Sequence, residues 1–185
     1  MQKASEYSDK ELLSLFNESG KRDEAFRLIV LKFQERLYWH IRKILIDHDD
    51  TDDVLQNTFM KAWNSMEGFR GESGLFTWLY RIATNESLTF LNQKRRRFLF
   101  PLEKVEKQLS DTLDADEYFN GDELQLKLQK ALLTLPEKQR VVFNMKYFDE
   151  MKYEEIAEVL ETSVGALKAS FHHAVKKIEK YLTES

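Results

Sequence analysis

Apolar residues recur every three or four positions along most of the chain, with polar residues between them. This is the spacing of side chains on one face of an α-helix, whereas a half-buried strand would alternate at every second residue. With only six Gly and two Pro to break helices, the pattern predicts an all-α protein. The predicted helices lie within residues 9–19, 23–46, 54–66, 76–97, 123–135, 136–148 and, as a closely spaced pair, 153–178.

Two stretches interrupt the helical pattern and divide the chain. Residues 67–75 hold three of the six Gly and predict a loop with Phe69 and Arg70 at its tip. Residues 98–122 lose the helical period and carry seven acidic residues against two lysines, which is typical of a flexible tether. The predicted organisation is therefore a unit over residues 1–97, an acidic linker over 98–122 and a second unit over 123–185.

Several helix ends can be predicted from groups that satisfy free backbone atoms. Asp9 is placed to cap the first helix, and Gly20 to stop it. Pro136 is tolerated in a first helical turn and is expected to start a helix there. The acidic run at 47–53 precedes the helix at 54–66, where a helix dipole favours negative charge. His40 has no second His at metal-ligand spacing, so we interpret it as a structural residue of the long helix.

Residues 153–177 predict two helices joined by a tight turn, which is a helix-turn-helix pattern. Thr162 or Ser163 in the turn can accept hydrogen bonds from the N–H groups that open the second helix. Small and cationic residues such as Gly165, Lys168 and His172 lie off its apolar stripe. Such a surface suits the major groove of DNA, which admits an α-helix and whose phosphates attract cations. At this point a plain amphipathic hairpin with a solvated face remains the alternative.

The helix at 54–66 and the residue before it present a polar face beside a large aromatic residue. Asp53, Gln56 and Asn57 point away from the predicted core, and Trp63 lies near the boundary. Exposed aromatic residues often anchor protein interfaces, so this face indicates either a binding surface or an ordinary solvated helix. The residues alone favour the solvated face.

The helix at 76–97 combines aromatic and cationic side chains. Trp78, Arg81, Asn85 and Thr89 share a face, and the helix ends in a run of four cations at 94–97. One or two cations would complement the helix dipole, but four exceed that need. Stacking surfaces beside phosphate contacts are what single-stranded DNA requires, so this helix is a candidate single-strand binder.

Composition narrows the functional classes. The net charge is -4, but basic residues concentrate at 81–97 and 163–180, and the local field decides nucleic-acid binding. The chain has no Cys, which excludes disulfides and thiolate metal sites, and its four His form no HExxH motif. We therefore expect neither a metal-dependent enzyme nor a cofactor. No apolar run reaches the roughly 18 residues that span a bilayer, and no signal core opens the chain, so we expect a cytoplasmic protein that is not membrane-embedded.

Four blocks of sequence occur in a specific order and spacing. They are DDVLQNTFMKAW at 52–63, FRGESGLFTWLYRIATN at 69–85 with QKRRR at 93–97, LTLPEKQRVVFNMKYF at 133–148, and YEEIAEVLETSVGALKASFHHA at 153–174. In these blocks the chain resembles the extracytoplasmic-function sigma factors of bacterial RNA polymerase. The resemblance implies two small helical domains, sigma region 2 and region 4 with its helix-turn-helix, joined by the flexible acidic linker. It also implies a transcription initiation factor that is not an enzyme.

The resemblance also assigns roles to individual residues and reverses the preference for a solvated face at 54–66. Docking on core polymerase would use Asp53, Gln56, Asn57, Phe59 and Trp63. Melting of the minus-ten promoter element and capture of its single strand would use Phe69, Arg70, Ser73, Trp78, Arg81, Asn85, Lys94, Arg95 and Arg96. The minus-thirty-five element would be read as duplex by Ser163, Gly165, Ala166, Lys168, Ala169, His172, His173 and Lys176. The implied partners are core RNA polymerase, promoter DNA and an anti-sigma factor, and no homo-oligomer is needed.

The chain departs from the family pattern at several positions. Glu161 stands where the family usually has Gly, Lys152 where a Ser cap is expected, and His173 where Arg is common. Replacing Arg by His removes a fork that binds guanine at two atoms, worth about 1–3 kcal/mol, so we expect a different base preference. Further departures are Asn57, Ala166 and Ala169.

An ordinary helix-turn-helix regulator is the competing hypothesis. Such a protein would bind duplex operators as a dimer. It would need neither the Gly-rich loop nor the acidic tether, and no separate dimerisation helix is evident in the sequence.

Overall fold

The computed structural model describes residues 4–69, 71, 73–98, 111, 113 and 123–184, including all side chains except those of 95–98. All regular structure in these ranges is helical, which confirms the predicted all-α class. The long helices are α1 (Asp9–Asn17), α2 (Arg22–Leu45), α3 (His48–Ser65), α4 (Leu75–Phe98), α6 (Glu123–Leu133), α7 (Glu137–Tyr147), α8 (Tyr153–Leu160) and α9 (Val164–Glu184). Two short 3-10 helices lie at Ala4–Glu6 and Met66–Gly68.

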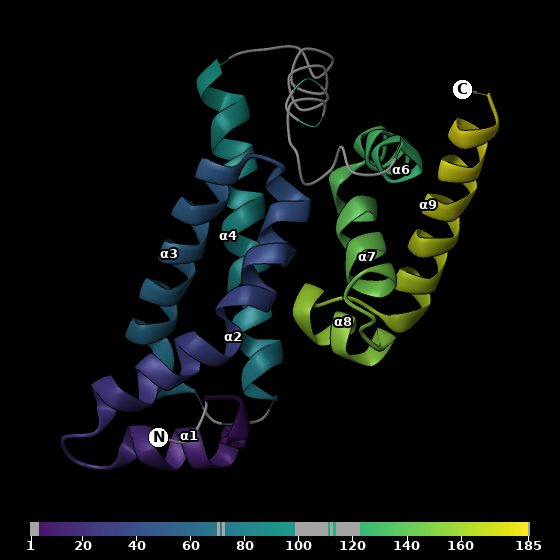
Figure 1. Ribbon diagram of the computed structural model, residues 1–185. Helices are drawn as coiled ribbons and strands as arrows, with labels where there is room; N and C mark the ends of the chain where they lie inside the picture. Colours follow the sequence, from purple (N-terminus) through teal and green to yellow (C-terminus); the bar gives the residue numbers. More distant parts are fainter. Residues whose placement is uncertain are drawn as a thin grey trace.

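Helices α1 to α4 pack together as one group (Figure 1). The long helix α2 contacts α1, α3 and α4, and its apolar stripe is fully buried at Ile29, Leu37, Ile41 and Ile44. The acidic run at 47–53 differs from the prediction because most of it belongs to α3. Asp47 is the N-cap, and its side chain accepts from the Asp50 N–H at 3.0 Å. The acids after it sit in the first turns, where the helix dipole favours them.

The prediction that Asp9 caps α1 is wrong. Ser8 is the N-cap: its hydroxyl accepts from the Glu11 N–H, while the Glu11 carboxylate accepts from the Ser8 N–H at 2.7 Å. Asp9 instead reaches another helix, where its Oδ2 accepts from the N–H of Leu75, the first residue of α4, at 3.1 Å. Its other oxygen accepts from Lys32 of α2 at 2.9 Å. Asp9 therefore ties α1 and α2 to the start of α4.

Helices α6 to α9 form the second group, beside the first in Figure 1. Helices α8 and α9 make the predicted helix-turn-helix, with Ile156, Val159, Leu167, Ala174 and Ile178 buried. Pro136 lies one residue before α7, at its N-cap position, instead of in its first turn. Most of the predicted linker lies outside the described residues, but Leu113 is fully buried and packs with Ile46 and Leu133.

The two groups of helices contact each other directly. Helix α8 packs on α4, and α7 packs on the end of α2. One hydrophobic cluster runs through both groups, because Val141, Met145, Ile156 and Leu167 join the buried residues of α2 and α4. The second group therefore closes over one side of the first.

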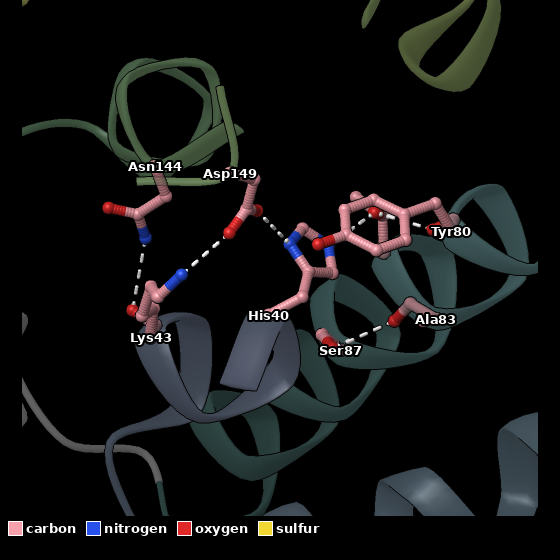
Figure 2. Close-up of polar contacts among 8 residues, drawn as sticks. His40, Lys43, Tyr80, Ala83, Ser87, Asn144 and Asp149 are labelled. Carbon is pink, nitrogen blue, oxygen red and sulfur yellow. Dashed lines mark hydrogen bonds and ion pairs between the residues drawn. The ribbon is translucent and has the colours of Figure 1, made fainter. Parts of the chain in front are cut away.

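Three charged or ionisable side chains, which we call the clasp, cross this contact (Figure 2). Asp149, between α7 and α8, has a side chain only 6% exposed. Its Oδ1 accepts from Nζ of Lys43 at 2.6 Å, and its Oδ2 lies 3.1 Å from Nδ1 of His40. Nearby, Nδ2 of Asn144 donates to the carbonyl of Lys43 at 3.2 Å. Buried charges are stable only when paired in this way.

Both ring nitrogens of His40 have partners. Nε2 lies 2.8 Å from the hydroxyl oxygen of Thr84, which also donates to the carbonyl of Tyr80 at 2.8 Å. Nδ1 lies 3.1 Å from the carboxylate of Asp149. The ring is fully buried and stacks on Tyr80 with centroids 4.2 Å apart. The prediction that His40 is structural is confirmed.

Burial and the two cations act in opposite directions on Asp149. Burial by itself would raise the pKa of this carboxyl, but the hydrogen bond and charge of His40, together with Lys43, outweigh it and lower the pKa to about 2. Burial also raises the pKa of the Tyr80 phenol, and the neighbouring Asp149 carboxylate adds to that rise. Asp149 therefore stays ionised, with its charge compensated from α2.

Candidate functional site

An apolar hollow lies between α2 and α3 at the predicted docking surface. Its volume is about 400 Å³, and it is lined by Phe26, Val30, Gln56, Phe59, Met60, Trp63 and Asn64. Asp53, Gln56 and Asn57 are exposed, while Phe59 and Trp63 are partly buried, as their positions on the helix predicted. Met60, one of the lining residues, is 56% exposed.

Aromatic neighbours fix the position of Trp63. Its ring meets Phe26 of α2 edge to face with centroids 5.0 Å apart, and Phe16 of α1 at 5.9 Å. The guanidinium of Arg22 lies 5.5 Å from the Trp63 ring. Phe26 and Val30 of α2 also line the hollow, and the docking residues predicted from the sequence did not include them. Their spacing of four residues fits a core position as well as a position in a hollow, so the sequence carried no signal to separate the two.

The loop before α4 tucks its aromatic residue against the helix. Phe69 is partly buried and lies 4.8 Å from Trp78, measured between ring centroids. Ser73 is also partly buried, and Gly71 adopts a positive φ of 71°. Arg70 lies outside the described residues. The structure therefore brings Phe69, Ser73 and Trp78 together at the start of α4.

The remaining residues of the α4 face differ in what surrounds them. Asn85 is exposed, whereas Lys94 is paired with Asp50 of α3. Arg81 is partly buried, and its Nη1 lies 3.4 Å from the carboxylate of Glu161 in the helix-turn-helix. The side chains of Arg95 and Arg96 lie outside the described residues.

The turn between α8 and α9 is built from two residues with distinct roles. Glu161 ends α8 in the left-handed conformation, with φ 51° and ψ 46°. Ser163 caps α9, because its hydroxyl accepts from the N–H of Ala166 at 3.2 Å. Of the two capping residues that the sequence offered, Thr162 and Ser163, Ser163 is the one that caps α9. At the start of α8, Lys152 stands at the N-cap, and its N–H donates to Glu155 at 2.7 Å.

One face of α9 presents the predicted reading residues to solvent. Gly165, Ala166, Lys168, Ala169, His172, His173 and Lys176 are all exposed. Opposite them, Leu167, Ala174 and Ile178 are buried against α6, α7 and α8. The exposed face therefore combines small residues with cations and imidazoles. Cations attract the phosphates of a nucleic acid, and small residues let its backbone come close.

Comparisons with known proteins agree with this architecture. Residues 29–97 match the family Sigma-70 region 2, and residues 125–178 match the family Sigma-70, region 4. The RNA polymerase sigma-H factor of Pseudomonas aeruginosa is 30% identical over 184 residues, which cover 94% of this chain and 93% of that protein. The sigma-E factor of Haemophilus influenzae, an extracytoplasmic-function factor, is 28% identical over 186 residues, which cover 95% of this chain and 96% of that protein.

The chain belongs to the extracytoplasmic-function sigma factors. As a member of this family it is a transcription initiation factor that directs RNA polymerase, and the family binds DNA through regions 2 and 4. Initiation factors of this kind are not catalytic enzymes.

Two solved structures share the fold of this sigma factor. CnrH, in complex with the cytosolic domain of CnrY, has a TM-score of 0.70 and 24% identity over 96% of this chain and 98% of its own. RpoE of Bartonella quintana, in complex with the anti-sigma factor NepR, has a TM-score of 0.67 and 22% identity over 86% of this chain and 98% of its own. At these identities the likeness concerns the fold alone.

The described residues contain neither a membrane span nor a metal cluster. Within the ranges that the structure describes, no helix is both long and apolar enough to cross a membrane. In the same ranges, no three His, Asp or Glu side chains are grouped so that they could hold a metal ion.

Proposed function

We propose that this sigma factor binds core RNA polymerase through the hollow between α2 and α3 and recognises promoters with two units. Residues 1–97 would melt the minus-ten element and hold its single strand, and residues 123–185 would read the minus-thirty-five element as duplex. The observation that carries the proposal is the separation of the predicted residues into an apolar hollow, an aromatic-cationic helix face and a small-cationic helix face.

The hollow has the properties of a protein-docking surface. Its floor is aromatic and aliphatic, its rim carries Gln56 and Asn64, and it opens beside the exposed carboxylate of Asp53. Buried aromatic anchors inside a polar rim are typical of the energetic centre of an interface. An amphipathic helical surface of polymerase with a basic edge would complement it.

The start of α4 supplies what an extruded base and its phosphates need. Phe69 and Trp78 provide aromatic faces, and base stacking on an aromatic ring contributes about 1–3 kcal/mol per base. Arg81 adds a cation and Asn85 an exposed amide. Unstacking a base costs a few kcal/mol, which stacking and phosphate contacts offset without any bond chemistry.

The exposed face of α9 would enter the major groove. There the exposed side chains of Lys168, His172 and His173 would reach base edges, and Ser163, which caps α9, would lie near the phosphates. We further propose that an anti-sigma factor binds this chain, as NepR binds RpoE in their complex. We also propose that the chain acts in the cytoplasm together with polymerase.

Open-complex formation tests the proposal. The chain is mixed with bacterial core polymerase and a library of promoter fragments, and both strand opening and transcript start sites are scored. We expect the chain to redirect core polymerase to a defined set of start sites. Duplex binding by the chain alone, with no change in start-site choice, would instead favour the helix-turn-helix regulator.

Single substitutions test the division of labour. Trp63→Ala or Gln56→Lys should weaken core binding at least tenfold, because an aromatic anchor is removed or a charge is added at the rim. Asn85→Ala should reduce strand opening while upstream duplex binding is retained. Glu35→Gln, on an exposed carboxylate of α2 that does not line the hollow, serves as the control. Equal loss of opening and of upstream binding in Asn85→Ala would refute the split between the units.

A further inference from the structure

The turn of the helix-turn-helix lies against the face of α4 that carries Arg81. Nη1 of Arg81 is 3.4 Å from Oε1 of Glu161, although the two residues are eighty positions apart in sequence. The Arg81 side chain is 35% exposed and that of Glu161 is 76% exposed. A cation that could contact a DNA phosphate is thus occupied by a carboxylate of the same chain.

Glu161 holds its position at a cost in backbone energy. Its φ of 51° lies in the left-handed region, which disfavours side chains other than Gly, Asn and Asp by about 1 kcal/mol or more. The contact of its carboxylate with Arg81 is an interaction that a glycine at this turn could not make.

The clasp holds the turn against α4. Asp149 lies two residues after the end of α7, and its side chain is anchored on Lys43 and His40 of α2. Arg140 of α7 adds a hydrogen bond to the carbonyl of Ile44 at 3.3 Å. Because α7 and α8 are joined by the loop that carries Asp149, this anchoring fixes α8 and its turn beside α4.

The closed arrangement cannot read both promoter elements at once. The minus-ten and minus-thirty-five elements are named for positions about 25 base pairs apart. On a straight duplex, at 3.4 Å per base pair, they therefore lie about 85 Å apart. In the closed chain the turn touches Arg81, and the reading face of α9 from Ser163 to Lys176 extends only about 20 Å at 1.5 Å per residue. The two units must therefore part when both elements are bound.

We propose that the free chain closes on itself, with the helix-turn-helix docked on α4 and the Glu161 carboxylate acting as an internal competitor of the minus-ten strand for Arg81. The inference rests on the proposed function, since it takes Arg81 as a contact to that strand. The Glu161 carboxylate can compete with a DNA phosphate for Arg81 because both groups offer anionic oxygens to the guanidinium. A partly exposed ion pair of this kind is also weak enough to be displaced.

Closure is tested by energy transfer within the full chain. Since the sequence has no Cys, Ser14→Cys in α1 and Lys177→Cys in α9 provide two unique labelling sites on exposed residues. We expect high transfer in the free chain, lower transfer with a saturating random-sequence single-stranded dodecamer, and lower transfer in Asp149→Asn without DNA. Circular dichroism checks that Asp149→Asn keeps its helices. Low transfer in the free wild-type chain would overturn the proposal.

Competition is tested by the affinity of the free full chain for the same dodecamer. An exposed ion pair contributes about 0.2–1 kcal/mol, and Glu161→Gln removes it. We therefore expect this variant to bind the dodecamer up to about fivefold more tightly than the wild-type chain. Glu158→Gln, which removes an exposed carboxylate of α8 one turn earlier, controls for the change in net charge. In an Arg81→Gln background the Glu161→Gln substitution should have no effect beyond that control. An equal gain in both glutamate variants, or an undiminished Glu161→Gln gain without Arg81, would refute the competitor.

These readouts separate the inference from the proposed function. Neither energy transfer nor dodecamer affinity involves polymerase, so closure and competition can be established in a chain that fails to redirect core polymerase. Conversely, a chain that redirects polymerase but shows no coupling between Glu161 and Arg81 keeps the proposed function and loses this inference.

Discussion

Glu161 adopts a backbone conformation that its side chain does not favour. It ends α8 with φ 51° and ψ 46°, the position at which helices most often carry Gly. A Cβ in this region meets the neighbouring carbonyl, which glycine avoids. The dihedral angles give the physical reason why a glycine would suit this position better.

Replacing Glu161 by Gly should stabilise the fold. Relief of the left-handed strain contributes about 1 kcal/mol, while the lost pair with Arg81 and the greater freedom of glycine in the unfolded chain subtract part of it. We expect a net gain of about 0.5 kcal/mol in the free energy of unfolding, measured with urea. Glu161→Asn should gain a similar amount, whereas Glu161→Val should lose stability. A loss in the Gly variant would show that the pair outweighs the strain.

At the scale of elements, α1 does more than cover the core. Helix α4 begins after Gly74, whose carbonyl accepts from the Trp78 N–H at 3.1 Å but which has no side chain to act as a cap. Asp9 supplies that cap from α1, held by Lys32 of α2. The helix that carries Trp78, Arg81 and Asn85 is thus started by a residue of another helix.

Asp9→Ala should loosen the first turn of α4. Loss of a capping carboxylate costs about 1 kcal/mol, so we expect that decrease in the free energy of unfolding and faster hydrogen exchange at Leu75. Asp9→Asn, which keeps an acceptor oxygen, should recover part of the protection. Glu11→Ala removes only the capping box of α1 and should leave exchange in α4 unchanged. Equal exchange at Leu75 in both alanine variants would contradict the role of Asp9.

At the scale of the whole molecule, the clasp joins helices that are about a hundred residues apart in sequence. Removing one member of a buried ion cluster leaves the others uncompensated, which typically costs 3–5 kcal/mol. Separation of the two groups of helices would return His40 and Lys43 to water. We therefore expect Asp149→Ala to favour separation of the groups over global unfolding, visible as transfer between the labels falling before helicity is lost in urea.

The same carboxylate predicts a dependence of stability on pH. The folded pKa of Asp149, about 2, lies below its reference value of 3.8, so the unfolded chain binds the proton more tightly. The stabilisation, about 2 kcal/mol, is complete above pH 4 to 5 and is lost as pH falls toward 2. The difference in unfolding free energy between wild type and Asp149→Asn should shrink over that window. A difference for Asp149→Asn that stays constant with pH would contradict the assignment.

The sequence by itself determined the helices, their buried faces and the family. Helical periodicity is a local property, so the stripe of α2, the exposed positions of α3 and the turn between α8 and α9 could be read from spacing alone. The choice of Ser163 over Thr162 as the cap of α9 needed the structure. The order of the motif blocks was enough to identify a sigma factor. The sequence predicted helix boundaries less accurately where acidic residues fit either a loop or a first helical turn. At 47–53 it placed before the helix residues that belong to α3.

Only the tertiary structure decided which helices meet and through which side chains. The reach of Asp9 to Leu75, the hollow that Phe26 and Val30 share with Trp63, and the clasp of Asp149 with His40 depend on contacts between distant segments. Periodicity states that a residue faces inward but not which partner it finds there. A buried charge reveals its partner only once the chain has brought the two together, because no local pattern encodes a contact across more than a hundred residues.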